Sequence, residues 1–166
     1  MTASMYANPH NKGAVVNRLS AMVLGATEID LDFNINVTTG AGGRIMGGSG
    51  GHSDTAAGAE LAIVTSRLCA RNVAKVVNNV STVTTPGESI DVLVTERGVA
   101  VNPRRNELCE RLIHSGIPIR PIEELRDLAN QSVAPIIPKV HEAEKIVAVV
   151  QYRDGTIIDV IRKRAI

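Results

Sequence analysis

Glycine is concentrated in one short part of this sequence. Seven of the 14 glycines lie between residues 40 and 51. Ordering a glycine costs more backbone entropy than ordering any other residue, so a cluster this dense indicates a backbone path that side chains would obstruct. Ser53 and Asp54 follow the cluster and predict a cap for an alanine-rich helix over residues 55–61.

The glycine cluster lacks the two common nucleotide-binding signatures. No Gly-Lys-Ser/Thr ends it, as in a P-loop, and no correctly spaced G-x-G-x-x-G follows a strand, as in dinucleotide-binding folds. What remains is the run Gly48-Ser49-Gly50-Gly51 directly before a helix. Backbone N–H groups in such a loop can approach a phosphate, a carboxylate or a developing oxyanion closely. The residues alone leave two interpretations open, an anion site and a loop with unusual dihedral angles.

Two side chains beside the loop are further candidates. His52 is a candidate hydrogen-bond donor or base, although a histidine in such a loop is also typical of a solvated position. Asp54 is a candidate for orienting a substrate or for capping the helix. The remaining histidines are scattered, and Cys69 and Cys109 have no metal-binding spacing. We therefore predict no metal site.

Composition excludes several classes of function. The 18 basic residues balance 17 acidic ones, which leaves no electrostatic footprint for nucleic acid. Aromatic residues make up 2% of the chain, too few for a base-stacking platform. No apolar run approaches the roughly 18 residues that a membrane span needs, and the N-terminal residues show no signal-peptide pattern. Two cysteines without a disulfide framework favour a reduced, cytoplasmic protein.

Apolar periodicity divides the chain into short strands and helices. Helices are predicted over residues 11–19, 55–61, 104–114 and 122–128, and strands over residues 22–29, 34–37, 62–65, 90–95, 99–101 and 117–120. A β-branched stretch over residues 74–85 ends at Pro86-Gly87, and residues 132–139 are predicted to cross the surface. Asp154-Gly155, between apolar residues 145–151 and 156–161, predicts a hairpin. The pattern indicates a single α/β domain over residues 1–166 on a mixed sheet.

Several segments together resemble a known family. They are Asn8-Pro9-His10-Asn11, LGATEIDLDFNINV at 24–37, RIMGGSGGHSD at 44–54, Thr84-Thr85-Pro86-Gly87, IDVLVTERGVAV at 90–101 and VAVVQYRDGTIIDV at 147–160. This set resembles the citrate lyase α-subunit family and, more distantly, the CoA-transferase and acetyl-CoA hydrolase superfamily. The resemblance extends from about residue 3 to residue 160. It implies a CoA-transferase-like open mixed or parallel sheet flanked by helices, with a C-terminal hairpin.

The resemblance also implies a reaction and its partners. A citrate CoA-transferase exchanges acetyl for citryl on the CoA-like thiol of an acyl carrier (γ) subunit, and a β subunit then cleaves the citryl group. The CoA-type thioester is a substrate, and no covalently bound cofactor is implied. Citrate and acetate are the small-molecule partners, and the family pattern makes the chain the C-terminal domain of a longer subunit in an oligomeric complex.

The implied catalytic residues are Asn8, Gly50 and Gly51, whose amide groups match those that bind the thioester oxyanion in the superfamily. Gly48, Ser49, His52 and Asp54 are the implied substrate-binding residues. Much of the superfamily forms a thioester on a glutamate that lies upstream of the segment matched by Asn8, so that glutamate is absent from this chain. The citrate lyase branch is thought to proceed without such an intermediate.

Two other functions fit the same residues. The chain is alternatively a non-catalytic fragment or assembly module of the lyase complex, since the upstream part of the family pattern is missing. It is alternatively an acetyl-CoA hydrolase or a transferase for another carboxylate, because these enzymes share the glycine loop.

Overall fold

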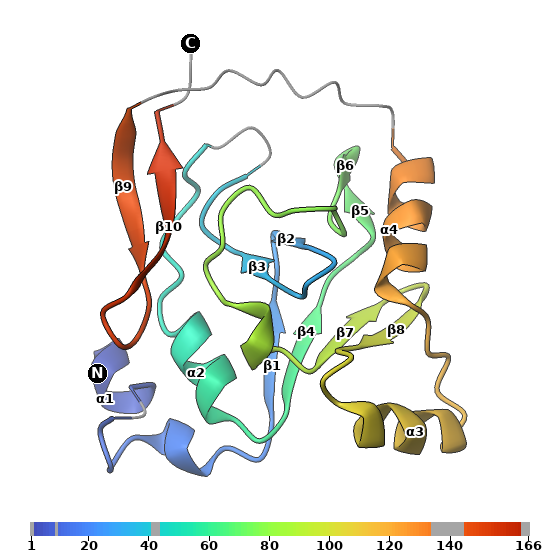
Figure 1. Ribbon diagram of the computed structural model, residues 1–166, viewed down its shortest axis with the longest axis horizontal. Helices are drawn as coiled ribbons and strands as arrows, with labels where there is room; N and C mark the ends of the chain where they lie inside the picture. Colours follow the sequence, from blue (N-terminus) through green and yellow to red (C-terminus); the bar gives the residue numbers. More distant parts are fainter. Residues whose placement is uncertain (1, 9, 41–43, 134–144, 164–166) are drawn as a thin grey trace.

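The computed structural model describes residues 2–8, 10–40, 44–133 and 145–163 (Figure 1). At its centre lies a four-stranded sheet in the order β1-β4-β7-β8, formed by Met22–Gly25, Ala62–Thr65, Val92–Thr95 and Gly98–Val101. β1 and β7 run parallel to β4, and β8 is antiparallel to β7. The sheet is therefore mixed, as predicted. Its strands are rich in Val, Ile and Leu, and one face of the sheet is buried, whereas Val23 of β1 is exposed.

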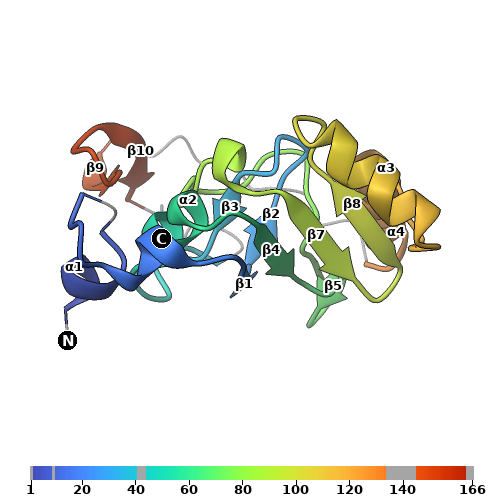
Figure 2. The ribbon, with the colours of Figure 1, turned by 90° about the horizontal axis from the view of Figure 1, so that it is seen from below.

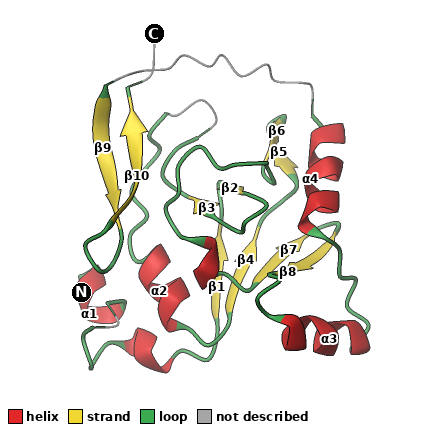
Figure 3. Ribbon diagram, in the orientation of Figure 1, coloured by secondary structure: helices red, strands yellow, loops and turns green. Residues whose placement is uncertain are grey.

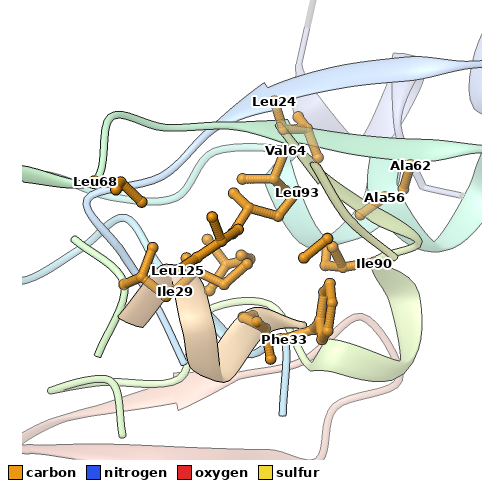
Figure 4. Close-up of a cluster of buried hydrophobic side chains, with 14 of the residues drawn as sticks. Leu24, Ile29, Phe33, Ala56, Ala62, Val64, Leu68, Ile90, Leu93 and Leu125 are labelled. Atoms are coloured by element: carbon orange, nitrogen blue, oxygen red, sulfur yellow. The ribbon is translucent and has the colours of Figure 1, made fainter. Parts of the chain in front are cut away.

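The register of the sheet places large apolar residues beside one another. Leu24 pairs with Val64, and Val64 pairs with Leu93, so three strands contribute to one buried cluster. Leu125 from α4 (Ile122–Gln131) is fully buried against this cluster. Figure 4 shows Leu93, Leu125 and Ile29 meeting in the interior. The apolar face predicted for residues 122–128 is thus confirmed as the face that packs on the core.

The remaining helices are short and lie around the sheet. They are α1 (Ala3–Tyr6), α2 (His52–Gly58) and α3 (Asn106–His114), together with the 3₁₀ turns η1 (Val15–Arg18) and η2 (Gly87–Ser89). α3 ends before Ser115-Gly116, as predicted, although none of its residues is fully buried. Residues 11–19 form only the turn η1, so the helix predicted there is wrong. Figure 2 shows α1 and the C-terminal hairpin at one end of the molecule and α3 and α4 at the other.

Long loops join two small two-stranded sheets to the main one (Figure 3). These sheets pair β2 (Glu28–Ile29) with β3 (Ile35–Asn36), and β5 (Cys69–Ala70) with β6 (Val73–Ala74). The strand predicted over residues 22–29 is therefore split, since β1 ends at Gly25. Residues 75–85 pair only through isolated bridges. Residues 117–120 likewise form one bridge rather than a strand.

Buried polar side chains explain why the β2–β3 region is irregular. The side-chain amide of Asn36 donates to Glu28 at 3.0 Å and to the carbonyl of Thr39 at 2.8 Å. Glu28 also accepts from the backbone N–H of Ser81 at 3.0 Å. These bonds replace the ladder that a regular strand would supply, because buried polar groups need partners.

The C-terminal hairpin forms as predicted. β9 (Ile146–Gln151) pairs antiparallel with β10 (Ile157–Arg162). The hairpin docks on the body of the molecule through Asp159, which accepts from the backbone N–H of Val83 at 2.7 Å, and through buried Ile161. The predicted surface crossing over residues 132–139 lies largely outside the described residues. Within those described, no helix is long and apolar enough to cross a membrane.

Candidate active site

The glycine loop leads directly into α2. Gly50 has φ +57, a left-handed conformation that favours glycine, and Gly51 precedes the first helical residue. Ser53 and Asp54 lie inside the helix, and no side chain caps it, so the predicted cap is wrong. α2 is only 7 residues long, so the loop's own amides, rather than the helix, must supply the donors.

Four consecutive backbone amides of the loop, those of residues 48–51, have no acceptor among the described residues. The N–H groups of Met46 and Gly47 donate to the carbonyl of Thr38. Among the described residues, the N–H groups of Gly50 and Gly51 donate to nothing. Gly50 is exposed, whereas Gly51 is buried beneath it. Adjacent donors of this kind can stabilise an anionic oxygen.

The end of α1 packs against Gly51. A Cβ at position 51 would lie 2.9 Å from the hydroxyl of Tyr6 and 3.0 Å from the Cβ of Ala7. Only glycine allows this approach without a shift of its neighbours, and Asn8 follows Ala7 directly in the chain. The structure thus brings the segment that leads into Asn8 against the glycine loop, and the catalytic roles implied for Asn8, Gly50 and Gly51 stay predictions.

Asn8 is oriented by its own turn. Its side-chain oxygen accepts from the backbone N–H of His10 at 2.9 Å. This contact fixes which end of the amide faces the turn and leaves Nδ2 without an acceptor in the described part of the chain. Asn8 is half-buried, and its Nδ2 is a further candidate donor on the segment that packs against the loop.

His52 holds the loop in place through both ring nitrogens. Nε2 lies 2.9 Å from the carbonyl of Gly25 and therefore donates to it, while Nδ1 lies 2.8 Å from the hydroxyl of Thr85 and accepts from it. Burial lowers the pKa of the His52 imidazole below its ordinary value near 6.5, and the Gly25 carbonyl partly opposes this effect. A neutral ring with both nitrogens engaged positions the loop and is not available to a ligand.

Asp54 is half-buried on α2, and its carboxylate accepts no hydrogen bond from another described residue. Burial raises the pKa of its carboxyl above its ordinary value near 3.8, and the positive charges of Arg153 and His10 act in the opposite direction. Arg153 comes from the turn of the C-terminal hairpin. The sequence predicted that turn but contained no local signal that its tip returns to α2.

Gly48 and Ser49 lie on the open side of the loop, exposed and half-buried respectively. Two hollows of about 400 and 420 Å³ lie elsewhere on the surface, and both include Glu88 and Arg104. The loop borders neither of them. In the described part of the chain, no three His, Cys, Asp or Glu side chains are close enough together to hold a metal ion.

The sequence matches one protein family almost from end to end. Residues 1–164 match the family described as citrate lyase, alpha subunit. The citrate lyase alpha chain of Klebsiella pneumoniae is 49% identical over 163 residues, which are 98% of this chain and 32% of that protein. That of Escherichia coli K12 is 47% identical over the same shares. The chain therefore spans about a third of the length of these relatives.

Two further comparisons extend the match. Succinyl-CoA:acetate CoA-transferase from Clostridium kluyveri is 31% identical over 113 residues, covering 63% of this chain and 21% of that protein. A crystal structure of the α subunit of citrate lyase from Streptococcus mutans, in complex with citrate, superposes with a TM-score of 0.91 at 45% identity. The superposition covers 98% of this chain and 32% of the chain in that crystal structure. The chain belongs to the citrate lyase α-subunit family.

Proposed function

We propose that this chain supplies the thioester-binding loop of a citrate CoA-transferase. In that reaction, citrate replaces acetate on the CoA-like thiol of an acyl carrier protein. The observation that carries the proposal is the glycine loop, in which the amides of Gly50 and Gly51 have no acceptor among the described residues, packed against the end of the segment that leads into Asn8. Backbone amides without an internal acceptor fit an oxygen that becomes negatively charged during the reaction, and we propose that the side-chain amide of Asn8 is a third donor to it.

The chemistry of the exchange shows where such donors act. A citrate carboxylate oxygen attacks the acetyl thioester carbonyl, whose oxygen takes up the negative charge of the tetrahedral intermediate. The C–S bond then breaks, which releases the thiolate and leaves a mixed anhydride of acetate and citrate. The thiolate attacks the citryl carbonyl of the anhydride, and acetate leaves. Both attacks create an oxyanion, so donors that bind it accelerate both steps.

The partners follow from the family. We propose that the sequence is the C-terminal domain of a longer α subunit, which works with a β subunit and an acyl carrier subunit in a multi-subunit complex. The threefold greater length of the relatives supports this proposal. The assembled enzyme, meaning the complete α subunit with these partners, is therefore the material for activity measurements.

Asn8 offers a sharp test, because its two amide atoms have different roles. Asn8→Asp keeps the oxygen that accepts from His10 but replaces the donor with a negative charge. We expect the rate of acetyl-to-citryl transfer in the assembled enzyme to fall by about 10²–10³, the usual cost of one oxyanion donor. Asn11→Asp is the matched control, since Asn11 makes the same kind of turn to Gly13 at 3.2 Å.

Near-wild-type transfer by Asn8→Asp would refute the proposed role of the site. A rate loss equal to that of Asn11→Asp would do the same, because it would show a general effect of charge on this segment.

A second candidate is transfer to a different carboxylate, supported by the 31% identity with succinyl-CoA:acetate CoA-transferase. The same loop serves any thioester, so the acceptor distinguishes the two functions. Assays that offer citrate, succinate or acetate to the same acyl thioester measure this directly. A preference for citrate supports the first function, and a preference for succinate supports the second.

A further inference from the structure

The tip of the C-terminal hairpin reaches the candidate active site from a distant part of the chain. Figures 1 and 2 both place this tip beside the loop after α1 and near α2. Tyr152 anchors it, with its hydroxyl 3.2 Å from that of Ser89. The turn itself is closed by bonds from Tyr152 N–H to Thr156 and from Gly155 N–H to Tyr152. Arg153 is thus carried on a closed turn that Tyr152 connects to Ser89.

Arg153 is a half-buried cation without a close partner. Among the described residues it makes no hydrogen bond and no ion pair within 4.0 Å. Its charge nevertheless acts on Asp54, as does the charge of His10, which follows Asn8 by two residues. The hairpin tip that carries Arg153 lies near α2, the helix that begins at the glycine loop (Figures 1 and 2), and the N–H groups of Arg153 have no acceptor among the described residues.

The substrate proposed above needs such a group. One carboxylate of a tricarboxylate reacts, and the others stay ionised. An ionised carboxylate near Asp54 is repelled unless a cation compensates for that charge. A guanidinium group binds carboxylates with two parallel hydrogen bonds. Acetate, the leaving product, has no second carboxylate to bind.

We infer that Arg153 binds a non-reacting carboxylate of the acceptor and selects polycarboxylates over monocarboxylates at this site. The inference rests on the proposed function, since it names the acceptor-binding residue of the same site. Arg153 is a specificity-determining residue on this reading, whereas Asn8, Gly50 and Gly51 act on the thioester carbonyl.

The test is a comparison of Michaelis constants in the assembled enzyme. We expect Arg153→Gln to raise KM for citrate by roughly 10- to 100-fold, because hydrogen bonds between two charged groups are lost. KM for the acyl thioester and kcat stay within about twofold of wild type, because binding energy for the acceptor alone is removed. Arg153→Lys keeps the positive charge but loses the two parallel N–H donors of the guanidinium, so it should restore part of the affinity for citrate. Arg97→Gln, at an exposed turn of the main sheet, is the matched control.

A double variant separates ligand binding from simple charge balance. If Arg153 only neutralises Asp54, adding Asp54→Asn to Arg153→Gln restores KM for citrate to the wild-type value, which would overturn the inference. An unchanged KM in Arg153→Gln alone would overturn it as well. We expect the double variant to stay impaired for citrate.

The two proposals fail in different ways. A normal rate in Asn8→Asp removes the proposed function whatever Arg153 does. A slow Asn8→Asp enzyme combined with a normal citrate KM in Arg153→Gln keeps the proposed function and removes only the role of Arg153.

Discussion

His52 ties the start of α2 to two other segments, so its replacement tests how the glycine loop is held. In His52→Ala, the hydroxyl of Thr85 loses its acceptor, and Thr85 is 0% exposed. A buried polar group left without a partner costs about 1–3 kcal/mol. The carbonyl of Gly25 loses its donor too, but Gly25 is exposed and water replaces the bond. We therefore expect the free energy of unfolding to fall by about 2–3 kcal/mol once lost packing is included.

His52→Gln is the matched control, because one glutamine side chain offers both functions that the ring uses. Its NH₂ group donates to the carbonyl of Gly25, and its oxygen accepts from Thr85. We expect a loss below about 1 kcal/mol. Urea denaturation followed by far-UV circular dichroism measures both variants, with the midpoint as the readout.

The same pair predicts a difference in pH dependence. The pKa of folded His52 lies below its ordinary value, so the unfolded chain takes up a proton first as the pH falls below about 6.5. That uptake favours the unfolded state, and the stability contributed by the neutral ring is lost on acidification until the folded pKa is reached. The urea midpoint of His52→Gln should decline less than that of wild type between pH 7.5 and 5.5, roughly the range that brackets an ordinary histidine pKa. Parallel declines, or equal destabilisation by Ala and Gln, would refute the bridging role.

Three further substitutions test the packing around the site. Gly51→Ala pushes a methyl group against Tyr6 and Ala7 and should lower the free energy of unfolding by about 1–3 kcal/mol. It should also slow acyl transfer. Gly48→Ala is the control: an added Cβ there has nothing within 4 Å, so the urea midpoint should stay unchanged. Gly87→Ala places Cβ 1.9 Å from a backbone oxygen and should cost at least about 3 kcal/mol by the same urea measurement. Leu125→Ala empties a fully buried position and should lower the free energy of unfolding by about 2–5 kcal/mol, with the midpoint falling at unchanged slope.

Local sequence signals predicted the elements that depend on local packing. The strand over residues 62–65, the hairpin and the helix over residues 122–128 all show strong periodicity and clear turn residues, and all three are present. Residues 74–85 are equally β-branched, yet they form no long strand. Their backbone bonds go to single residues of β2 and β3 and to the side chains of Glu28, Asp30 and Asp159, which no window of the sequence reveals.

In the candidate site, too, the features set by local sequence were predicted, and those set by distant residues were not. Glycine density located the loop, because its backbone path is a local property. The capping role of Ser53 and Asp54 was wrong, since the helix begins earlier, at His52, whose ring bonds to β1 and to Thr85. Those partners are 27 and 33 residues away. No spacing rule connects positions so far apart in the chain.

Glycine at position 51 meets two requirements that come from different parts of the molecule. Its amide must remain without an internal acceptor for an oxyanion to use it, and its missing side chain must leave room for Tyr6 and Ala7. Any larger residue would move α1 and, with it, the amide of Asn8, even where its own N–H stayed in place. If Gly51→Ala slows transfer more than Gly50→Ala does, the additional loss of rate therefore comes from the displacement of α1 and of Asn8, which follows it. Position 50 has nothing within 4 Å of an added Cβ and tests only the strain of a left-handed backbone.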